Sequence, residues 1–264
     1  MVNTTMVIIP THNHPTTLKY SVESAQNQTV NDLDIVIIGD GVTDDTRDVI
    51  SDIIKTDNRV RFEDEPKRIS RNEVARHRIV SESKSDIVTY LGDDDLLLSK
   101  HVEVMRDMLV DSDFTHPLPV IVYPNNIFTV SRVNLKDKKW VDYHLKPKQN
   151  EISLTGASHT MDLYRKLKFG WRVAPKNIWS DLYMWRQILL TPNIKLSSSD
   201  LSTTIKLPSS ARKENDILNR ESEIERWSIV IKNSDFFDLW QNKILKTEKF
   251  VNRIINNKTW IKKE

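Results

Sequence analysis

Three consecutive carboxylates, Asp93, Asp94 and Asp95, follow the apolar run IVTYL at residues 87–91 after a single glycine, Gly92. A short run of β-branched and aromatic residues is typical of a buried strand. Three adjacent carboxylates repel one another unless a cation lies among them, and Mg²⁺ or Mn²⁺ prefers such hard oxygen ligands. Ions of this kind commonly bridge to the phosphates of a nucleotide. The alternative is that the acids only cap the next helix and face solvent.

Composition narrows the class of protein. The chain has 264 residues with 38% hydrophobic content, enough for a core in one large domain or a domain with an appendage. Lys and Arg total 39 against 37 for Asp and Glu, so net charge alone indicates no polyanionic partner. The absence of cysteine excludes disulfides and thiolate chemistry, and no P-loop or GxGxxG motif occurs. No apolar stretch is long enough to cross a bilayer, so we expect a soluble, cytoplasmic protein.

Strands and helices alternate through the first half of the chain. Apolar runs at residues 6–9 and 34–38 and a shorter run at 59–62 predict strands, with helices expected between and after them. This alternation predicts a parallel sheet with right-handed crossovers. Ligands bind beyond the carboxyl ends of such strands, where His12, Asp40 and the three aspartates all fall. The coincidence favours a site for a nucleotide and a metal ion.

The spaced elements in this half resemble a known family. They are IIPTHN at residues 8–13, IIGDGVTDDT at 37–46, the pair Ala75 and Arg76, and YLGDDD at 90–95. Together they cover roughly the first hundred residues and resemble the family 2 glycosyltransferases of the GT-A fold. The sequence departs from the usual family pattern at Gly39, where a second aspartate is common, at His77 in place of asparagine, and at Gly92 in place of aspartate.

The resemblance implies a donor site for a nucleoside diphosphate sugar, with uridine favoured. An imidazole can stack on a pyrimidine, and a carboxylate can accept the imide hydrogen of uracil. The alternatives are an ordinary surface histidine and arginines on a solvated helix face. The implied donor-binding residues are Pro10, Thr11, His12, Asn13, Asp40, Arg71, Arg76, Asp93 and Asp94, and the implied ligands of Mn²⁺ or Mg²⁺ are Asp93, Asp94 and Asp95.

The chain changes character near residue 115. Residues 120–123 and 127–133 alternate like an antiparallel pair, and residues 136–148 are charged and are expected to form an exposed loop. We predict an α/β, GT-A-like domain over residues 1–213, with a mostly parallel nucleotide-binding sheet flanked by helices. Residues 1–115 form its nucleotide-sugar half and 116–213 its acceptor half, which contains a small antiparallel portion. A helical C-terminal extension follows over residues 214–264.

The acceptor half contains a candidate general base. In inverting relatives a carboxylate ahead of a helix removes the proton of the acceptor hydroxyl, and Asp181 fits that position. A helix-capping role suits the same residue. The predicted substrate contacts are His159, Trp171, Arg172, Trp185 and Arg212, the last of which could neutralise the leaving group. The alternatives are a structural histidine and tryptophans in the core.

The predicted reaction is therefore inverting, metal-dependent transfer of a sugar from a nucleoside diphosphate sugar, favouring UDP, to a hydroxyl group. The acceptor could be a glycan, a protein side chain or a modified nucleobase. Two rival functions are a nucleotidyltransferase and a module that binds nucleotide sugars without turnover. The segment 243–264 carries seven basic residues against two acidic ones, and could contact an anionic partner or form a solvated helix face.

Overall fold

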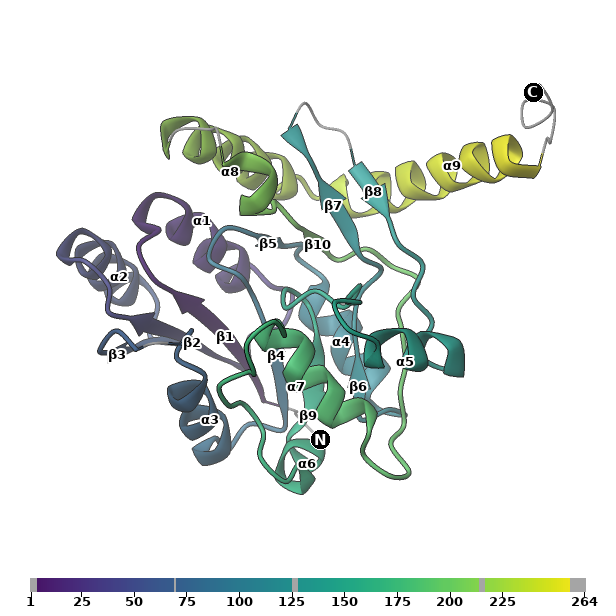
Figure 1. Cartoon of the computed structure of the whole chain (residues 1–264). Helices are drawn as coiled ribbons and strands as arrows, with labels where there is room; N and C mark the ends of the chain where they lie inside the picture. Colours follow the sequence, from purple (N-terminus) through teal and green to yellow (C-terminus); the bar gives the residue numbers. More distant parts are fainter. Residues whose placement is uncertain (1–3, 69, 125–127, 214–216, 257–264) are drawn as a thin grey trace.

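A six-stranded sheet forms the centre of the computed structural model, which describes residues 4–68, 70–124, 128–213 and 217–256, with side chains as far as residue 246. The strand order is β3-β2-β1-β4-β9-β6 (Figure 1). Strands β1 to β4 run parallel, and β9 is antiparallel to both β4 and β6. The bounds are β1 Thr5–Thr11, β2 Leu33–Asp40, β3 Val60–Glu65, β4 Ile87–Tyr90, β6 Phe114–Thr115 and β9 Ser158–Thr160. The predicted α/β class with a mostly parallel sheet is confirmed.

Alternation along β1 sorts its side chains onto the two faces of the sheet. Met6 and Ile8 pack with helices α3 (Glu73–Glu82), α6 (Met161–Lys166) and α7 (Ser180–Leu189). Val7 and Ile9 point to the opposite face. There they pack with α1 (Pro15–Gln26), α2 (Asp44–Thr56) and α4 (His101–Leu109). All four of these β1 side chains are fully buried, so helices cover both faces of the sheet.

Two short antiparallel pairs of strands form separate two-stranded sheets outside the central sheet. Strand β7 (Val120–Val122) pairs with β8 (Phe128–Val130), as the alternation predicted, although residues 125–127 lie outside the described part of the chain. Strand β5 (Leu96–Leu97) pairs with β10 (Thr204–Ile205), which brings the segment after the aspartates against the end of the acceptor half. The prediction of a loop over residues 136–148 was wrong, because α5 (Lys138–Leu145) forms there, with the Asp137 carboxylate accepting from the Lys139 backbone N–H.

Two helices follow the 3₁₀ turn η2 (Ser209–Arg212), namely α8 (Ile217–Ile231) and α9 (Phe236–Asn256). Ile224 and Trp240 from these helices join a third apolar cluster with Leu96, Leu98 and Val120. Helix α8 lies along α1, and α9 extends away from the body of the molecule (Figure 1). No described helix combines the length and the apolar character needed to span a bilayer. Where the catalytic domain ends and an extension begins stays a prediction.

Candidate functional site

The carboxyl ends of β1, β2 and β4 meet at one edge of the sheet, because Thr11 pairs in register with Gly39 and Ile8 with Tyr90. At this edge the Thr11 hydroxyl donates a 2.7 Å hydrogen bond to Asp93, which lies 82 residues further along the chain. The loop after β1 and the acidic cluster after β4 are therefore one contiguous surface, as the sequence predicted from the topology of parallel strands.

His12 and Asp40 are neighbours at the ends of β1 and β2. The exposed His12 ring makes a 2.7 Å hydrogen bond from Nδ1 to the backbone carbonyl of Asp40, which fixes the ring beside that residue. The Asp40 carboxylate is buried and accepts from Lys67 Nζ at 2.6 Å and from the backbone N–H of Arg68 at 3.2 Å. Asn13 accepts from the Thr43 backbone N–H, and so ties the two loops together. Pro10, which was also predicted to contact the donor, is a half-buried residue near the end of β1.

The two predicted arginines near α3 differ in burial. Arg71 is exposed, whereas Arg76 is 4% exposed and stacks over Trp171 with its guanidinium carbon 4.3 Å from the ring centroid. Burial lowers the pKa of Arg76, and the nearby Tyr90, Glu73 and Asp181 partly oppose that effect. The Arg76 Nε group is buried with no hydrogen-bond partner among the described residues. Arg76 is thus a buried cation close to Asp181, and its predicted contact with the donor stays a prediction.

The three aspartates have distinct environments. Asp95 is 4% exposed and accepts hydrogen bonds at both oxygens, from the Leu207 backbone N–H at 2.7 Å and from the Thr155 hydroxyl. The bond from Leu207 holds the turn after β4 against the segment that follows β10, and the bond from Thr155 holds it against the residues just before β9. Each oxygen of Asp95 thus already has a hydrogen-bond partner in the protein, and which of the three predicted aspartates would hold a metal ion stays a prediction.

Asp93 and Asp94 each meet a basic side chain. Asp93 accepts from Thr11 and from His14, whose Nδ1 is 3.0 Å away, and this hydrogen bond raises the pKa of His14. Asp94 contacts the Ser209 hydroxyl and the Arg220 guanidinium, with 3.0 Å between Oδ2 and Nη2. Burial, followed by the neighbouring carboxylates Asp95 and Asp93, raises the pKa of Asp94 to about 6.

The residues present fit a divalent ion at Asp93 and Asp94. Their Oδ1 atoms accept no hydrogen bond from a described residue, so each carboxylate keeps one oxygen that could bind an ion. In the described part of the chain, no group of three His, Asp or Glu side chains forms a complete ligand set. An ion held here would need further ligands from a diphosphate and water, which is how Mg²⁺ is usually bound in nucleotide sites.

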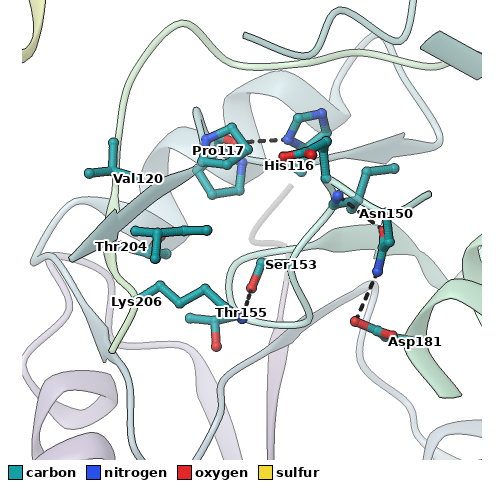
Figure 2. Close-up of a pocket in the computed structure, with 13 residues that line it drawn as sticks. His116, Pro117, Val120, Asn150, Ser153, Thr155, Asp181, Thr204 and Lys206 are labelled. Carbon is teal, nitrogen blue, oxygen red and sulfur yellow. Dashed lines mark hydrogen bonds between the residues drawn. The ribbon is translucent and has the colours of Figure 1, made fainter. Parts of the chain in front are cut away.

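Asp181 lines a cavity of about 110 Å³ formed by residues between His116 and Lys206. Asp181 lies in the first turn of α7. Its carboxylate accepts hydrogen bonds from the Leu182 backbone N–H and, at 3.2 Å, from Asn150 Nδ2. Figure 2 shows Asp181 and Asn150 on one side of the cavity and Lys206 on the other, where Lys206 donates to Ser153 at 2.7 Å. Burial raises the pKa of Asp181, and Lys206 and Arg71 partly counteract this. A carboxylate with a raised pKa is a stronger base.

Three predicted substrate contacts lie inside the core instead. His159, Trp171 and Trp185 are each at most 1% exposed. The Tyr90 hydroxyl links two of them, accepting from Trp171 Nε1 at 2.8 Å and bonding to His159 Nε2 at 2.8 Å. Trp185 Nε1 donates to the Ile152 carbonyl. Burial lowers the pKa of His159 to about 4, so the ring is neutral. This burial corrects the prediction of direct substrate binding in favour of the structural alternative.

The two remaining predicted arginines also have protein partners. Arg172 stacks on Phe169 at 3.8 Å and donates to the Tyr183 hydroxyl. Arg212 is 3% exposed and forms a two-pronged pair with Glu223, using Nε and Nη2 at 2.6 Å each. Because this pair joins η2 to α8, Arg212 has a structural role here, which corrects the prediction that it neutralises a leaving group.

Sequence reasoning missed Arg220, Lys206 and the contact between His14 and Asp93. Arg220 and Lys206 are solitary basic residues in segments with no recognisable motif, and Arg220 lies 126 residues from Asp94. The sequence places His14 close to His12, but its contact with Asp93 follows only from the pairing of β1 with β4 in the folded protein.

Of the basic C-terminal residues, Lys258, Lys262 and Lys263 lie outside the described residues, so their contact with an anionic partner stays a prediction.

Comparison with known proteins identifies the class. Residues 6–170 match the family described as Glycosyl transferase family 2, and since this match spans more than half of the 264 residues, the chain belongs to that family. It is similar to the GalNAc(5)-diNAcBac-PP-undecaprenol beta-1,3-glucosyltransferase of Campylobacter jejuni, at 32% identity over 93 residues, 35% of this chain and 30% of the relative. Chondroitin synthase of Pasteurella multocida is 34% identical over 106 residues, 40% of this chain and 11% of the relative. The chain thus spans less than a third of either relative.

Similarity to solved structures establishes the fold over more of the chain than the family match covers. S. aureus TarS in complex with UDP-GlcNAc aligns with a TM-score of 0.59 at 16% identity, covering 99% of this chain and 76% of the TarS chain. A mannosyltransferase from Pyrobaculum calidifontis in complex with GDP-Man and Mn²⁺ aligns with a TM-score of 0.55 at 14% identity, covering 86% of this chain and 65% of the other. The predicted GT-A fold is confirmed by these likenesses.

Proposed function

We propose that the protein transfers a sugar from a nucleoside diphosphate sugar to an acceptor hydroxyl, with inversion at the anomeric carbon. The observation that carries the proposal is the shared sheet edge, where His12 and Asp40 lie beside Asp93 and Asp94. Membership of family 2 supports the same reaction class, and neighbouring folds bind UDP-GlcNAc and GDP-Man. UDP-linked sugars are the favoured donors.

The donor base is proposed to lie against His12 and Asp40. The His12 hydrogen bond to the Asp40 carbonyl holds the exposed ring in one orientation, which suits stacking on a pyrimidine. The Asp40 carboxylate, already shared by Lys67 and the Arg68 backbone, retains lone pairs for an imide hydrogen. The diphosphate then extends from these residues toward Asp93 and Asp94.

Asp93 and Asp94 are proposed to hold Mn²⁺ or Mg²⁺, which would neutralise the charge of the departing diphosphate. The second half of the site is the cavity that contains Asp181. Its carboxylate accepts the proton of the acceptor hydroxyl as that oxygen attacks, while Asn150 holds the carboxylate in position. The cavity lining mixes prolines with hydrogen-bonding groups at Asn150, Ser153 and Lys206, and we expect it to bind the part of the acceptor that carries the reacting hydroxyl.

The test is release of nucleoside diphosphate from a panel of nucleotide sugars, UDP-GlcNAc included, with Mn²⁺ and with chelator. The proposal predicts release with at least one UDP-linked sugar in Mn²⁺ and its loss in chelator. Full activity in chelator would contradict the metal proposal alone. A nucleotide that binds and is never consumed would favour the binding-module alternative.

A further inference from the structure

The contact between Arg220 and Asp94 connects the C-terminal helices to the proposed donor site. Arg220 Nη2 lies 3.0 Å from Asp94 Oδ2 and 3.1 Å from the Ser209 hydroxyl. Its side chain is only 20% exposed and that of Asp94 only 17%, so the pair is largely shielded from solvent. A single helix thus brings a guanidinium to the same carboxylate that is proposed to hold the metal ion.

Other contacts already fix α8, so Arg220 is not needed to hold it. Glu221 pairs with Lys19 of α1 at 2.8 Å, and Lys232 at the far end pairs with Glu23 of α1 at 2.7 Å. The buried pair between Glu223 and Arg212 attaches the same helix to η2. These three ion pairs, together with the apolar packing of Ile224, place the backbone of Arg220 without help from its own side chain.

The guanidinium also retains unused donors. Only Nη2 of Arg220 makes hydrogen bonds, while Nε and Nη1 contact no acceptor among the described residues. A guanidinium presents its N–H groups in a planar fork that matches two oxygens of a phosphate. The free edge of this fork, held beside Asp94, is where the negative charge of a donor diphosphate would lie.

We propose that Arg220, contributed by the C-terminal helix α8, binds the diphosphate of the donor and positions it as the leaving group. This inference rests on the proposed function, because it assumes that the diphosphate lies at Asp93 and Asp94. It extends the donor site beyond residues 6–170 that match the family, and it assigns to Arg220 the role that sequence reasoning gave to Arg212.

The test compares UDP with uridine by titration calorimetry in Mn²⁺, using Arg220→Ala. Loss of a charge-assisted phosphate contact should weaken UDP binding by about 10- to 100-fold. Uridine lacks the diphosphate, so its affinity should not change. Arg226→Ala is the matched control, because Arg226 is exposed on the same helix and contacts only the Ser222 carbonyl among the described residues. It should bind both ligands like the wild type.

The outcomes separate the two proposals. If the wild type binds UDP and Arg220→Ala binds it equally well, the role of Arg220 is overturned and the proposed function stands. If the variant loses affinity for UDP and uridine alike, Arg220 supports the fold and the inference also fails. A wild type that binds neither UDP nor GDP overturns both proposals. Should Arg220→Ala not fold, Arg220→Lys replaces it, with a smaller loss for UDP and none for uridine expected.

Discussion

Replacing Asp181 by asparagine tests the proposed catalytic base with little change of shape. An asparagine carbonyl can still accept the 2.8 Å hydrogen bond from the Leu182 backbone N–H. The amide NH₂ group of the new asparagine would then face the Asn150 Nδ2 donor. The Asn150 side chain cannot flip without loss, because its Oδ1 accepts a hydrogen bond from the Ile152 N–H at 3.1 Å. We therefore expect a stability cost of about 1 kcal/mol for one lost hydrogen bond.

The expected loss of activity is much larger than this cost. General base catalysis typically contributes about 10²- to 10⁴-fold, which corresponds to about 3–5 kcal/mol of barrier. Release of UDP from a UDP-sugar should fall by that factor in Asp181→Asn, while the affinity for UDP stays at the wild-type value. Because burial raises the pKa of Asp181, wild-type turnover should also rise with pH as this carboxyl loses its proton.

Asp162→Asn is the matched control, because Asp162 is also an acidic residue in the first turn of a helix and its contact with Arg165 is on the surface. This variant should keep full activity. Turnover of Asp181→Asn at the wild-type rate, measured on folded protein, would refute the assignment of the base.

Two further predictions concern stability. Arg212→Ala should lower the free energy of unfolding in urea by about 3–5 kcal/mol, because it leaves the buried Glu223 carboxylate without its partner; a loss below about 1 kcal/mol would contradict the structural role of this pair. For Asp94, whose pKa is raised from 3.8 to about 6, the folded protein binds a proton between those pH values that the unfolded chain has released. In chelator the wild type should therefore lose on the order of 1–3 kcal/mol of stability as pH rises from about 4 to 6, whereas Asp94→Asn should lose less. Equal pH dependence of the two proteins would contradict the raised pKa.

Local patterns in the sequence were sufficient to predict the sheet and to place the candidate site residues at one of its edges. Buried strands are short apolar runs, and alternation with helices determines that they run parallel, so Thr11, Asp40 and Asp93 could be placed together. The prediction of a loop over residues 136–148 failed because local patterns do not decide the structure of that segment. Helix α5 has a mixed composition and packs against α7, so tertiary contacts decide its structure.

Roles that depend on distant partners could not be predicted. Asp94 and Asp95 are adjacent and chemically identical, yet Asp95 bonds to Leu207, 112 residues away, and Asp94 meets Arg220, 126 residues away. Trp171 and Trp185 resemble sugar-stacking residues in sequence, but their burial around Tyr90 is set by how β4 and α7 pack. The sequence gives no reason to assign different roles to Arg212 and Arg220. In the structure, Arg212 forms a buried ion pair with Glu223, whereas Arg220 contacts Asp94 in the acidic cluster.

We propose that a nucleotide sugar binds at the carboxyl edge of the sheet with its diphosphate at Asp93 and Asp94. A thermal-shift panel of UDP- and GDP-linked sugars, with and without Mn²⁺, tests this most directly, since a ligand that binds the folded state raises its melting temperature. We expect a rise with at least one UDP-linked sugar that is larger in Mn²⁺, and we expect Asp94→Asn to lose the additional rise that Mn²⁺ gives. No rise with any nucleotide sugar, or an equal additional rise in Asp94→Asn, would contradict the proposal.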